Sequence, residues 1–112
     1  MTMNHWTTAK VRPPTRGILA RIEQHPHDEK IRYIILFGSE ARGEARLGSD
    51  IDIALVSDEP LTRRERLAYT VLVGDSSPEV RFINTPAANL DTKQFSDVSY
   101  HIKRDGVLIY ER

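Results

Sequence analysis

The sequence predicts a small α/β domain in which a short mixed β-sheet is packed by helices. Two apolar runs, residues 34–37 and 51–56, flank a polar loop that contains three of the six glycines. Apolar runs bounded by glycines are typical of buried strands, and other stretches repeat apolar residues at helical spacing. A chain of 112 residues is long enough for one domain with a modest core.

The polar start of the chain predicts a flexible N-terminal arm over residues 1–16, ahead of a single domain over residues 17–112. Pro13 and Pro14 disfavour helix before the residue that follows them. We expect Trp6 to anchor the arm to the domain or to a partner, since packing is the commoner role of a lone tryptophan.

The first helix is expected over residues 15–24, with Thr15 as its N-cap. Its apolar stripe consists of Ile18, Leu19 and Ile22. A turn that contains a proline follows. We interpret the potential metal ligands in this turn as solvated surface rather than a metal site; they are His25, His27 and Asp28.

Strands are predicted over residues 31–37 and 51–56, and a helix over residues 61–73. Thr62 and Glu65 have the spacing of a capping box at the start of that helix. The apolar positions expected to be buried along it are Leu61, Leu67, Ala68, Val71 and Leu72.

Three arginines lie on or beside this helix, and two interpretations of them remain open. They hold phosphate or an acidic partner, or they form a solvated helix face paired with Glu65, which we favour. The three residues are Arg63, Arg64 and Arg66.

The last third of the chain predicts a strand over residues 79–84 and a helix within residues 91–103. Gly106 then marks a turn before a short closing strand over residues 107–110. The apolar positions of the helix are Phe95, Val98 and Ile102.

The most informative feature for function is an Asp-x-Asp pair at the start of the second predicted strand. Asp50 and Asp52 are two residues apart, so their side chains leave the same face of the strand. Two neighbouring half-buried carboxylates repel each other and lose hydration unless a cation lies between them. A hard divalent ion such as Mg²⁺ prefers carboxylate oxygens together with substrate phosphates.

The loop before this pair is suited to binding phosphate. Gly38 allows the backbone N–H groups to approach closely, and a helix that starts beside Ser39 would present its N-terminus to an anion. We expect Ser39 to cap this helix and to donate its hydroxyl group. A phosphate-binding loop that faces metal-binding carboxylates is typical of metal-assisted phosphoryl or nucleotidyl transfer.

Pattern and composition disfavour several other classes of function. The loop lacks the lysine of a Walker A motif, and no G-x-G-x-x-G follows a predicted strand. The 16 basic and 16 acidic residues balance, so no global field attracts nucleic acid or an anionic membrane. The chain has no cysteine, and we expect neither a membrane span nor a signal peptide and therefore a cytoplasmic location.

The central motif resembles the G-S-x-x-R-G-x(5)-S-D-x-D signature of the DNA polymerase β nucleotidyltransferase superfamily. Within it, the chain is most similar to the minimal nucleotidyltransferases (MNT), and the resemblance extends from about residue 31 to the C-terminus. The residues that carry it are Gly38, Ser39, Arg42, Gly43, Ser49, Asp50 and Asp52.

This resemblance implies a polymerase β-like core that transfers a nucleoside monophosphate, AMP from ATP, to a hydroxyl group. It implies that Asp50 and Asp52 are catalytic and bind Mg²⁺, while Gly38 and Ser39 hold the phosphates of ATP.

Two further residues of the motif are candidates for nucleotide binding, Arg42 and Ser49. Arg42 can instead pair with Glu40 or Glu44 within the loop.

The resemblance also implies a partner. MNT proteins are often paired with a HEPN-domain protein and act as antitoxins, and some transfer AMP to a tyrosine of the HEPN ribonuclease toxin. We therefore expect a HEPN protein as the acceptor, while the sequence leaves the oligomeric state open.

The sequence departs from the superfamily pattern where a third carboxylate is expected on the next strand, because alignment puts Arg81 there. Arginine cannot bind Mg²⁺. Glu79, about 7 Å earlier on the same strand face, can replace the acid after a register shift; alternatively, Arg81 pairs with Asp50 or Asp52. The competing interpretation is therefore a degenerate module that neutralises a HEPN partner by contact, without turnover.

Overall fold

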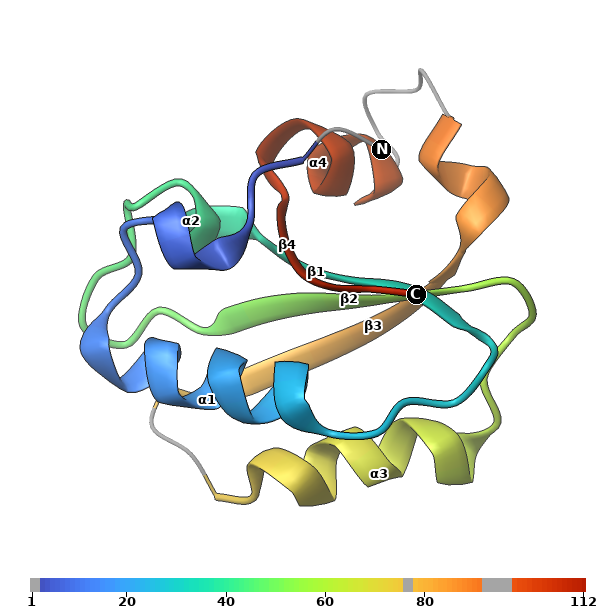
Figure 1. The fold of residues 1–112 in the computed structure, drawn as a ribbon. Coiled ribbons are helices and arrows are strands. Elements are labelled where there is room, and N and C mark those ends of the chain that lie inside the picture. The colour runs from blue at the N-terminus through green and yellow to red at the C-terminus, as the bar shows by residue number, and fades with distance from the viewer. Residues whose placement is uncertain (1–2, 76–77, 92–97) are drawn as a thin grey trace.

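The computed structural model describes residues 3–75, 78–91 and 98–112, which form one sheet with helices on both of its faces (Figure 1). The elements in chain order are η1 (Trp6–Thr8), α1 (Pro13–Gln24), β1 (Ile31–Phe37), α2 (Gly38–Ala41), β2 (Ile51–Ser57), α3 (Arg63–Val73), β3 (Val80–Pro86), η2 (Ala87–Asp91), α4 (Val98–Asp105) and β4 (Val107–Glu111).

The strands form a mixed sheet in the order β3-β2-β1-β4. β1 pairs antiparallel with β2 and β4, and β2 pairs parallel with β3. The predicted small mixed α/β architecture is therefore confirmed. β1 coincides with its predicted range, whereas β2 continues to Ser57 and β3 starts at Val80 and continues to Pro86.

The two faces of the sheet carry separate layers. α1 and α3 cover one face, and α4 lies over the other (Figure 1). On β2, Ile51, Ile53 and Leu55 pack into the core under α1 and α3, whereas Ala54 packs into the core under α4. Because side chains alternate along a strand, Asp52 lies on the α4 face. The predicted opposition of the aspartate face and the apolar face is confirmed.

The segment before α1 contacts the domain. Trp6 is 7% exposed and belongs to the core under α1, so it anchors the arm to the domain. α1 begins at Pro13, two residues before the predicted start, because the fixed φ of proline suits the first helical turn. Thr15 is not the N-cap, since Arg12 occupies that position and Thr15 is buried. The predicted flexibility of residues 1–16 concerns motion and stays a prediction.

The start of α3 has the capping box that the sequence predicted. Thr62 Oγ1 accepts a hydrogen bond from the N–H of Glu65, and the Glu65 carboxylate accepts one from the N–H of Thr62, so the capping box is confirmed. The N–H of Thr62 and then Lys30 lower the pKa of Glu65 to about 2. Glu65 pairs with Lys30 (2.9 Å) rather than with an arginine of α3, and those arginines are exposed.

Two of the five predicted buried positions are confirmed, since Leu61 is 6% exposed and Leu72 packs against the core. The other three are exposed, so the predicted stripe is wrong at Leu67, Ala68 and Val71. Leu67 and Val71 are 48% and 78% exposed, whereas Tyr69 and Val73 are 6% exposed and belong to the core. Residues 67 and 71 are four apart, as are residues 69 and 73, so helical spacing alone cannot tell which stripe faces the sheet.

The interpretation of His27 as solvated surface is also wrong, although His25 and Asp28 are exposed. His27 Nε2–H donates to the carbonyl of Ile22 (2.9 Å), and its Nδ1 accepts from the hydroxyl of Tyr69 (2.7 Å). Burial lowers the pKa of His27, which favours this neutral form. The ring joins the end of α1 to α3.

α4 starts at Val98, and its buried apolar residue is Ile102, which is fully buried, while Val98 is 44% exposed. The predicted position Phe95 lies outside the described residues. Within the part of the chain that the structure describes, no helix is long and apolar enough to cross a membrane.

Candidate functional site

The loop that follows β1 is in direct contact with the Asp-x-Asp pair. Gly38 has a φ of +78°, and a Cβ added to it would lie 2.7 Å from Oδ2 of Asp52. A side chain at this position is therefore disfavoured twice, by the left-handed backbone and by the carboxylate. Glycine lets the loop and the second aspartate lie against each other.

Ser39 lies in the first turn of α2 and is not its cap, so that prediction is wrong. Phe37 at the end of β1 occupies the N-cap position, and no side chain caps the helix. The chain turns at Gly38, which moves the extended cap residue back onto the strand. Among the described residues the Ser39 hydroxyl has no hydrogen-bond partner, so it is free to donate to a ligand.

The two aspartates face one guanidinium group. Asp52 is directly opposite Arg81 in the parallel pairing of β2 and β3. Arg81 Nη1 lies 3.6 Å from Oδ2 of Asp50, and its Nε lies 3.8 Å from Oδ1 of Asp52. These distances exceed those of good hydrogen bonds, and the Arg81 side chain is 64% exposed. The alternative in which Arg81 pairs with the aspartates is therefore observed, as loose ion pairs.

The environment of Asp52 disfavours its charged form. Burial raises the pKa of Asp52 above its ordinary value, the charge of Asp50 adds to this effect, and Arg81 opposes it. The protein therefore holds a carboxylate whose charge is only partly compensated by its own side chains.

Glu79 lies beside the same pair. Its carbonyl accepts a hydrogen bond from the N–H of Ile51 (2.8 Å), and it precedes β3 just as Asp50 precedes β2. Glu79 and Asp50 both line a surface cavity of about 550 Å³. Glu79 thus lines the same cavity as Asp50, but among the described residues no group of three acids is arranged to hold a metal ion. Its proposed replacement of the third acid stays a prediction, while Arg81 keeps the position opposite Asp52.

Arg42 follows the last residue of α2, and, against the effect of burial, its charge helps to lower the pKa of Asp52. It pairs with Glu44 (3.1 Å) and with Asp105 of α4 (2.9 Å), and not with Glu40. These acids raise its pKa, Glu44 more than Asp105. The alternative of pairing within the loop is observed for Glu44 only. The nucleotide-binding role of Arg42 stays a prediction.

Ser49 closes the turn that leads into the aspartates. Its hydroxyl oxygen accepts a hydrogen bond from the N–H of Arg46 (3.0 Å), and its own N–H donates to the Arg46 carbonyl (2.9 Å). These contacts shape the turn before Asp50. The predicted role of Ser49 in binding the nucleotide stays a prediction.

A buried ion pair behind the loop was not predicted from the sequence. Glu40 is 1% exposed and pairs with Arg12 Nε (2.8 Å) and with Thr15 Oγ1 (2.5 Å). Arg12 and Thr15 precede Glu40 by 28 and 25 residues in the sequence. No local sequence pattern therefore indicates that they are in contact with it.

The comparisons with known proteins agree with this geometry. A sequence model described as polymerase β nucleotidyltransferase matches residues 21–112. A search of curated proteins found no match. A toxin–antitoxin complex with AMP-PNP is 20% identical, with a TM-score of 0.57 over 90% of this chain and 75% of that chain.

Two further solved structures share the fold. A candidate nucleotidyltransferase from Sulfolobus solfataricus is 23% identical, with a TM-score of 0.51 over 88% of this chain and 84% of that chain. A mutant of the toxin–antitoxin pair MntA–HpeT, with two aspartates changed to glutamate, is 18% identical, with a TM-score of 0.54 over 90% and 75%.

A mixed sheet with a glycine loop against an Asp-x-Asp strand defines a nucleotidyltransferase-type domain. Because the family model covers most of the chain, this protein belongs to the polymerase β nucleotidyltransferase family.

This family generally uses Mg²⁺ and a nucleotide, and the residues present fit such a group. The carboxylates of Asp50 and Asp52 both lie within 4 Å of one cationic group, the guanidinium of Arg81, and hard carboxylate oxygens suit Mg²⁺. Among the described residues no group of three or more His, Cys, Asp or Glu is arranged as a metal site. The fit therefore rests on two carboxylates and on oxygens that a nucleotide would add.

Proposed function

We propose that this protein is a Mg²⁺-dependent nucleotidyltransferase that moves AMP from ATP to a hydroxyl group of a HEPN-type partner and thereby acts as an antitoxin. The observation that carries the proposal is the contact between Gly38 and the Asp52 carboxylate. That contact brings the candidate phosphate loop and the candidate metal ligands into one site.

Each residue has a role in this proposal. Asp50 and Asp52 hold Mg²⁺, which when bound neutralises phosphate charge and orients the triphosphate. The backbone of Gly38 and the free hydroxyl of Ser39 donate hydrogen bonds to the β- and γ-phosphates. The raised pKa of Asp52 reflects uncompensated charge at the point where a cation would bind.

The reaction in this proposal transfers AMP from ATP to an acceptor hydroxyl group and releases pyrophosphate. The acceptor oxygen forms a bond to the α-phosphorus while the bond from that phosphorus to the bridging oxygen breaks, and pyrophosphate leaves. The acceptor loses its proton, and Glu79 is the candidate base because it lines the same cavity as Asp50.

The partner in this proposal rests on the fold relatives. Two of the solved structures that share the fold are toxin–antitoxin complexes, one of them with AMP-PNP. The described residues pack around one sheet, and in this proposal a second protein carries the acceptor hydroxyl.

Label transfer from α-labelled ATP tests this function. Wild-type protein is incubated with Mg²⁺ and any HEPN protein encoded beside it. Asp50→Asn/Asp52→Asn is compared with Asp75→Asn, a control at an exposed aspartate that does not line the cavity. We expect label on the partner with the wild type and the control, and none with the double variant. Equal labelling by the double variant would contradict the assignment of Asp50 and Asp52.

A second candidate function is the degenerate module that neutralises its partner by contact. It is favoured by Arg81, whose guanidinium competes with a divalent cation for both aspartates. In this alternative the wild type labels no acceptor but still blocks the partner's activity. Arg81→Asp then restores the missing carboxylate, and gain of label by this variant would identify a disabled transferase.

A further inference from the structure

Arg12 joins the two halves of the candidate site. Its Nε donates to Oε1 of Glu40 (2.8 Å), and its backbone N–H donates to Oε2 of the same carboxylate (3.1 Å). Its Nη1 donates to the carbonyl of Arg46 and its Nη2 to the carbonyl of Ser49, both at 2.9 Å. One side chain thus holds α2 on one side and the turn before Asp50 on the other.

The two ends of this connection are functional segments. Glu40 follows the candidate phosphate loop Gly38–Ser39 within α2, while Ser49 directly precedes the first aspartate. Arg12 also lines the cavity that contains Asp50 and Glu79. Since Glu40 is 1% exposed, its charge is held in place by Arg12 and Thr15 rather than by solvent.

We propose that Arg12 is a positioning residue, which fixes the phosphate loop relative to the Asp-x-Asp pair so that both can grip one metal–nucleotide. This inference rests on the proposed function of the site. Arg12 lies before residues 21–112, the part of the chain that the family model matches. The positioning role therefore belongs to the N-terminal segment of this chain, which the family model does not include.

The contacts require arginine rather than positive charge alone. A guanidinium has several donors in a planar fork, so it can bond a carboxylate and two carbonyls at once. A lysine at this position keeps the ion pair with Glu40 but has a single ammonium group, which cannot also reach the carbonyls of Arg46 and Ser49. We therefore expect Arg12→Lys to fold, because the buried carboxylate of Glu40 keeps its ion pair. The turn before Asp50 should lose the two hydrogen bonds that Arg12 donates to it.

Calorimetric titration with Mg²⁺–ATP and amide hydrogen exchange test the proposal. The matched control is Arg16→Lys, because Arg16 also donates to two carbonyls, those of Thr7 and Ala9, away from the site. We expect Arg12→Lys to weaken Mg²⁺–ATP binding about tenfold or more and to speed exchange over residues 43–50. Arg16→Lys should change neither quantity.

If the wild type binds Mg²⁺–ATP and Arg12→Lys binds it equally well, the inference about Arg12 is overturned and the proposed function is unaffected. Weakened binding without faster exchange also overturns it, since Arg12 would then act on the ligand directly. Failure of the wild type itself to bind Mg²⁺–ATP overturns the proposed function and this inference together. If Arg12→Lys does not fold, Arg12→Gln/Glu40→Gln removes both buried charges and is scored in the same way.

Discussion

At the scale of single residues, the site depends on the missing side chain of Gly38. Gly38→Ala should lower the free energy of unfolding by about 1–2 kcal/mol because of its positive φ, and it should also displace the Asp52 carboxylate. Gly74→Ala is the matched control, since Gly74 has a φ of +63° but open space around it, and it does not line the cavity beside Asp50. We expect both variants to be destabilised and only Gly38→Ala to lose nucleotide binding, measured by calorimetry. Equal binding losses would contradict the contact argument.

Asp52 gives a second prediction at this scale, one of stability against pH. Because the folded pKa of Asp52 is raised by burial, its charge destabilises the native state at pH values above that pKa. Asp52→Asn should therefore raise Tm at neutral pH by about 1–3 °C, and the gain should vanish as the pH falls below about 4, where the carboxyl is protonated in both states.

The control for this prediction is Asp75→Asn, because Asp75 is exposed. Thermal melts of both variants across the pH range measure the effect. A stabilisation by Asp52→Asn that persists at low pH would show a cause other than charge.

The shared strand face of the two aspartates was predictable from the sequence, whereas the hydrogen bonds around the candidate site were not. Asp50 and Asp52 share a strand face because the period of a strand is two, and this follows from spacing alone. Ser39 is not the cap because the chain already turns at Gly38, which puts Phe37 in the cap position. That Arg12 reaches the loop depends on contacts between segments far apart in the chain, which local patterns do not encode.

At the scale of elements, α3 offers a direct test of which stripe faces the core. Val73→Ala should cost about 1–3 kcal/mol of unfolding free energy because Val73 is 6% exposed. Val71→Ala should change it by less than about 0.5 kcal/mol, since Val71 is 78% exposed. Chemical denaturation measures both variants. A larger cost at Val71 would mean that α3 is rotated relative to the described packing.

The His27 contact gives an element-scale prediction about acid. Burial lowers the folded pKa of His27, so the unfolded chain takes up the proton first as the pH falls below about 6.5. Stability should therefore decrease through this window, and His27→Gln should show a shallower decrease between about pH 7.5 and about pH 5.5. Identical slopes in thermal melts of the two proteins would contradict the buried neutral histidine.

Elements were predicted well where the pattern is local. The range of β1 and the capping box at Thr62 and Glu65 are set by adjacent residues, and both are as expected. The buried stripe of α3 and the environment of His27 are set by how α1, α3 and β4 pack together, and His27 contacts both Tyr69 and Tyr110. Spacing within one helix does not contain that information.

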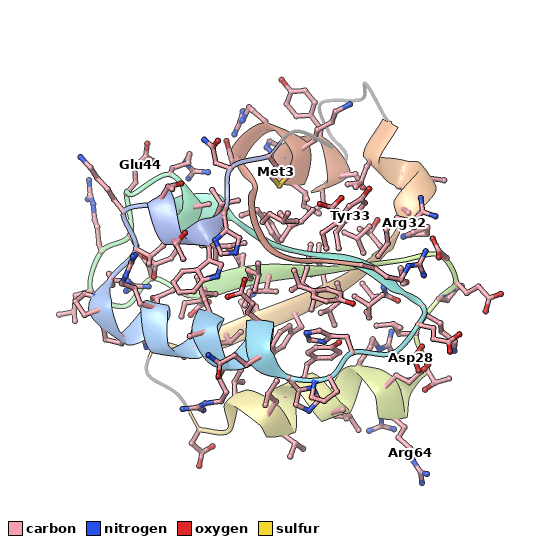
Figure 2. The ribbon with its side chains drawn as sticks, viewed as in Figure 1. Met3, Asp28, Arg32, Tyr33, Glu44 and Arg64 are labelled. Atoms are coloured by element: carbon pink, nitrogen blue, oxygen red, sulfur yellow. The ribbon has the colours of Figure 1, made fainter. Side chains whose placement is uncertain are left out.

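At the scale of the whole molecule, the side chains of the candidate site are partly open to solvent. Figure 2 shows Glu44 on the loop beside α2 and Arg64 on the outer side of α3, at opposite ends of the described structure. The aspartates and Arg81 are between about a quarter and two-thirds exposed, which leaves room for a nucleotide and for an acceptor carried by a partner.

The mixed fold was predictable because each strand and helix has its own sequence pattern.

The central claim is that Asp50 and Asp52 form a divalent-cation site that a nucleotide completes. Titration with Mn²⁺ followed by electron paramagnetic resonance, with and without ATP, measures this claim for the wild type, Asp50→Asn/Asp52→Asn and Asp75→Asn. We predict one bound ion per chain that ATP tightens, retained by Asp75→Asn and lost by the double variant. Mn²⁺ and ATP binding that is the same in the double variant as in the wild type would contradict the account.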